Sequence, residues 1–385
     1  MPAYRFRRWV ALAVVSALPA ACTSMDAPQS HLADPVQLSA DLRAISGVFQ
    51  SPVFESFAVI DSATGSPAAV ALRAGALLDA APITMPGTAA QAYASALRSL
   101  HAPRTAAWVL GPGNFTGVIP APLLGTTFVW DVATHAYVQS PGATPPAAAN
   151  AVRIILYVID PASRHIVESP LTPLGYVDLV DKSSGNTNSL QVTVFGGTPG
   201  GSGNTTYADY TVTPTVTGSP VVTGFNASAT GIVTDGTHTL DFSGTVASTG
   251  LDTNHPDLTI DGTWDLDNSV IHIVSHETLT SPDTNDNQIA LAYSVTRGNE
   301  TVTASGSIAQ VVSPQTLTVN VGFVVNGVPF ARIAGTNNGI TLLHANGSLL
   351  SGDETQAVSD LFTLPANVQS AVETLFNPAR HLMGG

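Results

Sequence analysis

A series of two-residue turns divides the second half of the chain into paired segments of alternating polarity. Asp235-Gly236, Asp267-Asn268, Gly298-Asn299 and Asn326-Gly327 each separate two stretches in which apolar side chains recur at every second position. Asp-Gly and Asn-Gly favour the tight turns of β-hairpins, because residues at the centre of such turns take positive φ. A period of two places the apolar side chains on one face of each strand. The sequence therefore predicts consecutive hairpins that share an apolar face.

The strand pattern begins well before these hairpins and covers most of the chain. We expect eleven or more strands between about residues 126 and 344,. The predicted fold class is α+β, predominantly antiparallel β, with one large curved sheet or incomplete barrel and helices from both chain ends packed on it. Interior glycines such as Gly306 and Gly335 indicate bends that curve the sheet. Two sandwich domains, divided in the Gly-rich stretch 196–204, are the alternative.

Helical patterns flank the strand region. Asp34 and Pro35 are typical of a helix start, and the apolar stripe Leu38, Leu42, Ile45 and Phe49 follows at helical spacing,. Further helical patterns occur over residues 88–100, 353–362 and 365–376. The predicted domains are a signal peptide (1–21), a lipidated tether (22–34), a mostly helical region (35–118), an antiparallel β domain (119–346) and C-terminal helices (347–385).

The N-terminus carries a secretory signal pattern. Arg5, Arg7 and Arg8 precede a short apolar run, which is too short to span a bilayer and is typical of a signal peptide,. The run ends in Leu18-Pro19-Ala20-Ala21-Cys22. This segment resembles the lipobox of bacterial lipoproteins, although Pro19 stands where that family usually has Leu, Val or Ile. Ordinary signal cleavage that leaves a free thiol is the alternative.

The lipoprotein resemblance implies a cellular location for the protein. It implies that Cys22, the only cysteine, becomes the mature N-terminus and carries fatty acyl chains such as palmitate. Several acyl chains anchor a protein firmly in a membrane. Thr23 follows the cysteine, and in this family a residue other than Asp usually permits delivery to the outer membrane. We therefore expect a lipid-anchored protein of the cell envelope, in the outer membrane, whose mature domain matches no family by motif.

Charge and cysteine content exclude several classes of function. The chain has 13 Lys and Arg against 27 Asp and Glu, a formal charge of −14, and no basic run. Nucleic-acid binding depends on basic side chains that neutralise phosphates, so we expect no nucleic-acid partner. A single cysteine excludes an intramolecular disulfide and any zinc site built from several cysteines.

Two groups of residues offer metal-ligating side chains. His272, His276 and Glu277 lie in a segment that alternates as a strand, where four residues span about 13 Å, too far for both imidazoles to bind one ion,. We interpret them as half-exposed strand histidines. A second group of side chains could ligate calcium weakly through their oxygens, although a solvated turn is the favoured interpretation: Asp283, Asn285, Asp286 and Asn287,. We therefore expect neither a resident metal nor a cofactor.

No catalytic motif is present. The chain lacks Gly-x-Ser-x-Gly and Ser-x-x-Lys, and no pair of carboxylates stands out among the 27 acids,. Three function classes follow. The favoured one is binding of an apolar small molecule or lipid in the concavity of the sheet. The others are a structural or adhesive surface lipoprotein that binds protein or glycan, and a cell-envelope hydrolase whose site the sequence does not reveal.

Overall fold

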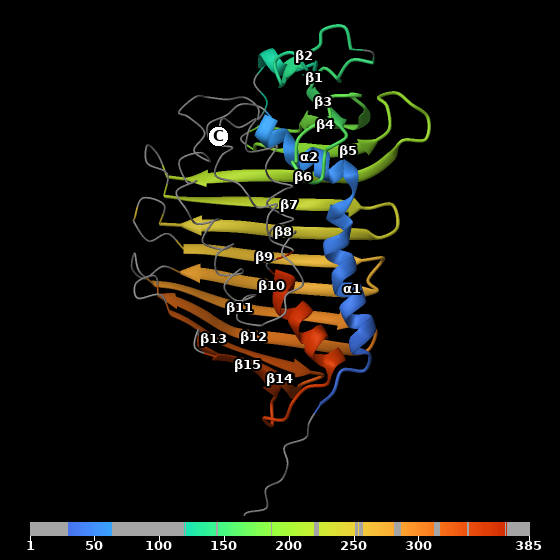
Figure 1. The fold of residues 1–385 in the computed structure, drawn as a ribbon. Helices are drawn as coiled ribbons and strands as arrows, with labels where there is room; N and C mark the ends of the chain where they lie inside the picture. The colour runs from blue at the N-terminus through green and yellow to red at the C-terminus, as the bar shows by residue number, and fades with distance from the viewer. Residues whose placement is uncertain are drawn as a thin grey trace, which may run out of the picture.

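A computed structural model shows the chain as one broad β-sheet with helices on one of its faces (Figure 1). The structure describes residues 30–63, 119, 121–143, 145–185, 187–218, 223–250, 253, 257–280, 286–311, 316–336, 339–365 and 367. Within these ranges, 15 strands form a single unclosed sheet that is mostly antiparallel. The predicted fold class, a large antiparallel sheet with N- and C-terminal helices, is confirmed.

The described elements are as follows. The helices are α1 (Pro35–Gly47), the 3₁₀ turn η1 (Val48–Gln50), α2 (Pro52–Ala63), the 3₁₀ turn η4 (Ala121–Leu123) and a C-terminal helix over residues 352–365. The strands are β1 (Thr126–Asp131), β2 (Ala136–Gln139), β3 (Ala151–Tyr157), β4 (Pro173–Asp181), β5 (Leu190–Gly196), β6 (Thr205–Thr217), β7 (Gly224–Thr234), β8 (Thr239–Thr249), β9 (Asp257–Leu266), β10 (Ile271–Thr280), β11 (Asp286–Arg297), β12 (Glu300–Val311), β13 (Thr316–Val325), β14 (Val328–Thr336) and β15 (Gly339–His344).

Strand order follows chain order almost throughout. From β15 to β3 each strand pairs with its neighbours in sequence, and the sheet then ends in β1 and β2. The four predicted turns join β7 to β8, β9 to β10, β11 to β12 and β13 to β14. The last two connections have two residues as predicted, whereas the first two have four, 235–238 and 267–270. The sandwich alternative required the Gly-rich stretch 196–204 to be a linker between two domains. Instead, residues 197–204 of this stretch form the loop that joins β5 to β6, which are paired antiparallel neighbours in the same sheet. The single-sheet prediction is therefore correct and the two-domain alternative is wrong.

One face of the sheet is apolar and forms the core. Buried side chains alternate along the strands and join the buried faces of α1, α2 and the C-terminal helix in one continuous cluster. Phe242 and Trp264 are an example, because their rings stack on adjacent strands with centroids 5.6 Å apart. Burial of this cluster supplies the main stabilisation of the fold.

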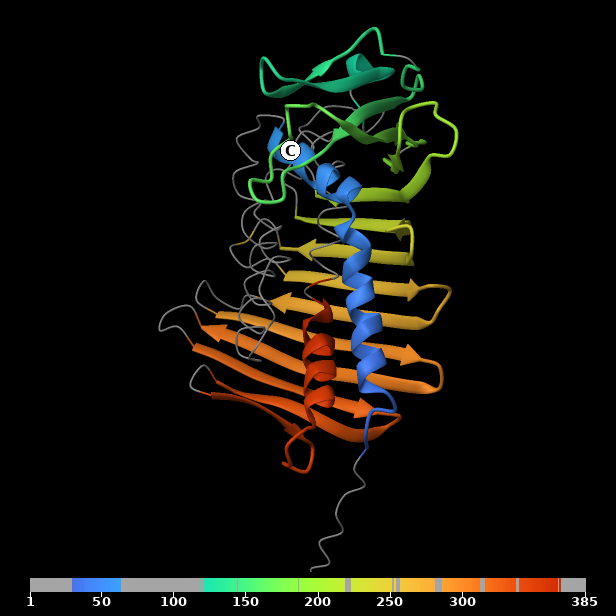
Figure 2. The same cartoon turned by 45° about the vertical axis from the view of Figure 1, so that its right-hand side comes forward.

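α1 and the C-terminal helix cross the apolar face side by side (Figures 1 and 2). Polar contacts fix both to β11. The hydroxyl of Tyr293 donates to the carbonyl oxygen of Leu361 at 2.6 Å, and Nε of Arg297 donates to Oδ2 of Asp41 at 2.7 Å. None of the helices in the described ranges is long and apolar enough to span a membrane.

α1 begins where the sequence predicts. Oδ1 of Asp34 accepts a hydrogen bond from the backbone N–H of Gln37 at 3.0 Å, and Pro35 occupies the first helical position. The helix ends at Gly47, and a 3₁₀ turn carries the stripe on to Phe49, which is buried. The predicted helix over residues 88–100 lies outside the described residues, as do residues 1–29 and 368–385.

Two interior glycines, Gly306 and Gly335, have a backbone conformation that other residues rarely adopt. Gly306 has φ 159° and Gly335 has φ 147°, and a Cβ at either would overlap with a backbone carbonyl oxygen of the next strand. Only glycine tolerates both the dihedral and the close approach. The sequence indicates bends in the sheet at the same two residues.

Candidate functional site

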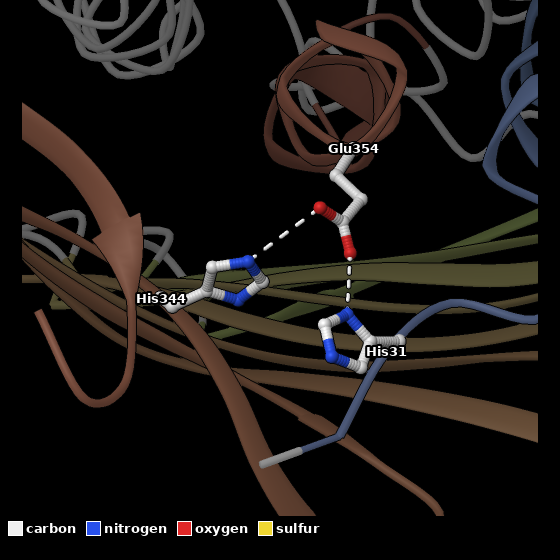
Figure 3. A group of neighbouring side chains, drawn as sticks. All are labelled: His31, His344 and Glu354. Atoms are coloured by element: carbon white, nitrogen blue, oxygen red, sulfur yellow. Dashed lines mark hydrogen bonds and ion pairs between the residues drawn. The ribbon is translucent and has the colours of Figure 1, made fainter. Parts of the chain in front are cut away.

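Three side chains from distant parts of the chain meet at one end of the sheet (Figure 3). His31 precedes α1, His344 ends β15, and Glu354 lies in the first turn of the C-terminal helix. The histidine nitrogens and the carboxylate oxygens that face each other all lie within 4.8 Å of one another. Among the described residues, this is the group of His, Cys, Asp and Glu that offers three ligand atoms at such distances.

Glu354 occupies the centre of this cluster. Its Oε1 lies 3.0 Å from Nδ1 of His31, and its Oε2 lies 3.5 Å from Nε2 of His344. The side chain of His344 is only 4% exposed, whereas that of His31 is 63% exposed. The cluster therefore has a buried inner side and an open outer side.

A capping box holds Glu354 in place. Oε2 of Glu354 accepts the backbone N–H of Ser351 at 3.0 Å, and Oγ of Ser351 accepts the backbone N–H of Glu354 at 3.2 Å. This reciprocal pair satisfies two N–H groups at the helix start and fixes the carboxylate rotamer. Burial raises the pKa of Glu354, but hydrogen bonds from His31 and Ser351 outweigh it and hold the pKa below its ordinary value. The carboxylate is therefore ionised at neutral pH.

The orientation of His344 is fixed from three sides. Nδ1 lies 3.2 Å from the carbonyl oxygen of Phe330, and the rings of Phe330 and His31 contact its ring edge-on at 5.4 and 5.5 Å. A carbonyl oxygen only accepts hydrogen bonds, so Nδ1 carries the proton and Nε2 faces Glu354.

The predicted strand histidines lie on the face of the sheet opposite the described helices (Figure 1), called the uncovered face below. Nδ1 of His272 lies 2.7 Å from Oδ1 of Asp265, and Nδ1 of His276 lies 2.6 Å from Oδ1 of Asp261. Each pair is also a direct cross-strand pair between β9 and β10. The two histidines therefore have separate partners, in agreement with their interpretation as partly exposed strand residues. Glu277 is buried on the opposite face.

A third pair of this type joins two neighbouring turns. Nδ1 of His238 lies 2.6 Å from Oδ2 of Asp267, whose Oδ1 accepts the backbone N–H of Thr239 at 2.8 Å. The hydrogen bond with Asp267 raises the pKa of His238 above its ordinary value of 6.5. Burial raises the pKa of Asp267, but the hydrogen bonds with His238 and Thr239 lower it more, so that it lies below 3.8.

The predicted calcium ligands and the predicted lipidation site lie only partly within the described residues. Asp286 and Asn287, two of the calcium candidates, are the first residues of β11. Asp283 and Asn285 lie outside the described residues, and so does Cys22, the predicted lipidation site.

The apolar face holds a buried polar atom whose hydrogen bonding is incomplete. Nε1 of Trp264 is one of three buried side-chain atoms that have no hydrogen-bond partner among the described residues. The indole folds over Gly262, where an added Cβ would lie 2.6 Å from Nε1. A buried N–H without an acceptor costs about 1–3 kcal/mol, so this donor requires an explanation.

The sequence offers one local signal for the His31, His344 and Glu354 cluster. Ser351-x-x-Glu354 is a recognisable capping box, which predicts that the glutamate lies at a helix start,. Nothing in the sequence brings the two histidines to it, because residues 31 and 354 are 323 positions apart.

Comparisons with known proteins identify no relative of this chain. No family model, no curated protein and no solved structure matches this chain. This agrees with the expectation that the mature domain matches no family by motif.

Proposed function

We propose that the protein is a lipid-anchored protein of the cell envelope that holds an amphipathic apolar ligand, such as a lipid, between its sheet and the crossing helices. The observation that carries the ligand is the buried Nε1 of Trp264, a hydrogen-bond donor without an acceptor among the described residues, on the mainly apolar face of the sheet. A ligand with an acceptor oxygen and an apolar tail would satisfy this donor and lie among apolar side chains.

The apolar part of such a ligand accounts for affinity without charged residues. Each buried methylene group contributes about 0.8 kcal/mol, so a long acyl chain binds through burial alone. The Phe242 ring stacked on Trp264 extends the apolar surface on the adjacent strand. A single hydrogen bond from Trp264 would then orient the polar end of the ligand.

The anchor follows from the lipobox-like segment ending at Cys22. We propose acylation of Cys22, with palmitate among the acyl chains, after removal of residues 1–21 as a signal peptide. The described fold begins at Ser30, whose Oγ donates to the carbonyl oxygen of Val325. Seven residues lie between Cys22 and Ser30, and the eight Cα–Cα steps that join them span at most about 28 Å, so the end of β13 would lie close to the membrane surface,. Thr23 after the cysteine supports the outer membrane as the destination.

Metabolic labelling tests the anchor. Cells that express the chain and are fed labelled palmitate should incorporate label into the wild type and not into Cys22→Ala. Fractionation should place the wild type in the outer membrane, and Thr23→Asp should redirect it to the inner membrane if the family's sorting rule applies. Cleavage of the wild type without incorporation of label would contradict the anchor.

Ligand binding is tested on the Cys22→Ala chain expressed without residues 1–21. Organic extraction and mass spectrometry should detect a co-purifying lipid, and a fluorescent polyene fatty acid should bind and be displaced by palmitate. Trp264→Phe keeps the ring stack but removes the N–H, and we expect about fivefold weaker probe binding, since one hydrogen bond contributes about 1 kcal/mol.

Trp130→Phe is the matched control for this experiment. Nε1 of Trp130 already donates to Oε1 of Glu168 at 2.9 Å, away from the crossing helices, so its loss should leave probe affinity unchanged. Absence of both lipid and probe binding would overturn the proposed ligand. Equal probe binding by wild type and Trp264→Phe would overturn the role of Trp264.

A further inference from the structure

We propose that His31, His344 and Glu354 bind one divalent transition-metal ion, for which zinc is the best fit. This site is independent of the proposed lipid ligand and of the anchor. It lies at the end of the sheet where the last strand, the segment before α1 and the C-terminal helix meet (Figure 3).

The donor set selects the class of metal. Two imidazole nitrogens and one carboxylate oxygen suit zinc, copper or nickel, whereas magnesium and calcium prefer ligand sets made of oxygen alone. Two histidines and one glutamate also form a known protein ligand set for zinc that keeps a fourth position open. The 63% exposed side chain of His31 leaves the outer side of the cluster accessible, so water can supply the fourth ligand.

The protonation of His344 leaves a place for a cation. Nδ1 donates to the carbonyl oxygen of Phe330, so in the neutral ring the lone pair of Nε2 points toward Oε2 of Glu354 at 3.5 Å. Two lone pairs that face each other in a buried site repel unless a cation lies between them. An imidazole that donates its other N–H to a backbone carbonyl is the usual outer-shell arrangement of a metal-bound histidine.

The distances match a site that closes slightly on binding. A tetrahedral zinc ion with ligands at 2.0–2.2 Å separates those ligands by about 3.4 Å. The two nitrogen–oxygen distances to Glu354 are 3.0 and 3.5 Å, and the largest separation between ligand atoms is within 4.8 Å. These two distances go to different oxygens of the carboxylate. Glu354 and His344 are held by hydrogen bonds, so the exposed His31 is the side chain that moves, by at most about 1.4 Å,.

Bound metal would connect the two ends of the chain. His31 and Glu354 are 323 positions apart, and His344 adds the last strand of the sheet. The ion would therefore fix the segment before α1 and the start of the C-terminal helix to the edge of the sheet. A proton on His344 is the competing occupant, because an imidazolium would also satisfy both lone pairs.

Metal titration of the Cys22→Ala chain, prepared without a histidine tag and treated with chelator, tests this proposal. Zinc should bind with a stoichiometry of one ion per chain in calorimetry, and cobalt(II) should give the visible absorption of a four- or five-coordinate site. Zinc should also raise the melting temperature, because it binds the folded state. His31→Ala should weaken zinc binding at least about tenfold and abolish the zinc-dependent rise.

His276→Ala is the matched control, because it removes another exposed histidine with a carboxylate partner, on the uncovered face of the sheet. It should bind zinc as the wild type does. Because His31 is exposed, His31→Ala should fold as the wild type does, and circular dichroism checks this,. No saturable binding by the wild type, or equal affinity of His31→Ala, would assign the site to a proton and overturn the proposal.

Discussion

Arg153 donates two hydrogen bonds of 2.7 Å to the carboxylate of Asp178, its direct neighbour on the next strand. The guanidinium also lies over the ring of Tyr176, 4.6 Å from its centroid. Arg153 is only 8% exposed, so the pair is largely removed from water. A planar, bidentate pair of this kind depends on the shape of arginine as well as on its charge.

Arg153→Ala should lower the free energy of unfolding by about 3 kcal/mol, because it leaves Asp178 partly buried without its cation. Arg153→Lys keeps the charge but loses the bidentate hydrogen bonding, and should lower the free energy of unfolding by about 1–2 kcal/mol. Denaturant unfolding measures both. Arg332→Ala, at an exposed arginine on β14, should stay within about 0.5 kcal/mol of wild type,. Equal stability of Arg153→Ala and Arg332→Ala would contradict the importance of the pair.

The His238–Asp267 pair should make stability depend on pH. The raised pKa of His238 means that its contribution is complete below pH 6.5 and disappears as pH rises through the folded-state pKa,. The lowered pKa of Asp267 means that its contribution is complete above pH 3.8 and disappears as pH falls through the folded-state pKa,. The pair therefore stabilises most between these two values, by less than about 1 kcal/mol because both side chains are partly exposed.

This pH dependence is measured as the difference in unfolding free energy between wild type and His238→Gln from pH 3 to pH 9. The difference should be largest near pH 5 and decline on both sides. Asp267→Asn should remove the same dependence while it keeps the acceptor for the N–H of Thr239. A difference that is constant with pH would show that the pair does not change its ionisation on folding.

Gly306→Ala should destabilise the sheet by about 2–4 kcal/mol. The φ of 159° and the approach of the Asn320 carbonyl leave no room for a Cβ, so the strand has to straighten and lose its bend,. Gly339→Ala, at a sheet position with no atom near the added Cβ, should have little effect. Thermal unfolding compares the two, and a similar melting temperature for both would show that Gly306 is not needed for the bend.

Asp34→Ala should cost about 1 kcal/mol through loss of the α1 cap,. Asp34→Ser supplies another oxygen for the N–H of Gln37 and should restore most of the stability. Chemical unfolding of the three proteins tests this. If serine fails to recover what alanine loses, the hydrogen bond to Gln37 is not the cause.

The parts of the fold that the sequence predicts depend on local patterns. Asn326-Gly327 takes positive φ at both positions, and a residue pair that favours this conformation indicates where a hairpin reverses,. α1 is predicted from its cap and stripe. α2 is harder, because its apolar residues, among them Phe54, Phe57 and Ile60, are dense enough for a strand or a helix. Ser51 and Pro52 at its start supply the missing signal, and Oγ of Ser51 caps the helix at Phe54,.

The candidate metal cluster depends on the fold as a whole. His31, His344 and Glu354 each lie in a different segment, and no periodicity relates them. The histidines that the sequence singles out, His272 and His276, are instead separated by strand geometry, which a period-two pattern predicts correctly. Local spacing therefore excludes a site more reliably than it reveals one.

The chain-order arrangement of the strands has a consequence for how the protein is made. β3 to β15 pair with sequence neighbours, so each hairpin can form as soon as it leaves the ribosome,. α1 is synthesised before all of them, but Asp41 contacts Arg297, 256 positions later, and Ser39 contacts Asp360, 321 positions later. The first helix must therefore stay without these partners until the last strands are complete. We therefore expect its docking to be a late, long-range step of assembly, and a chain that ends before residue 360 to lack the contact between Ser39 and Asp360,.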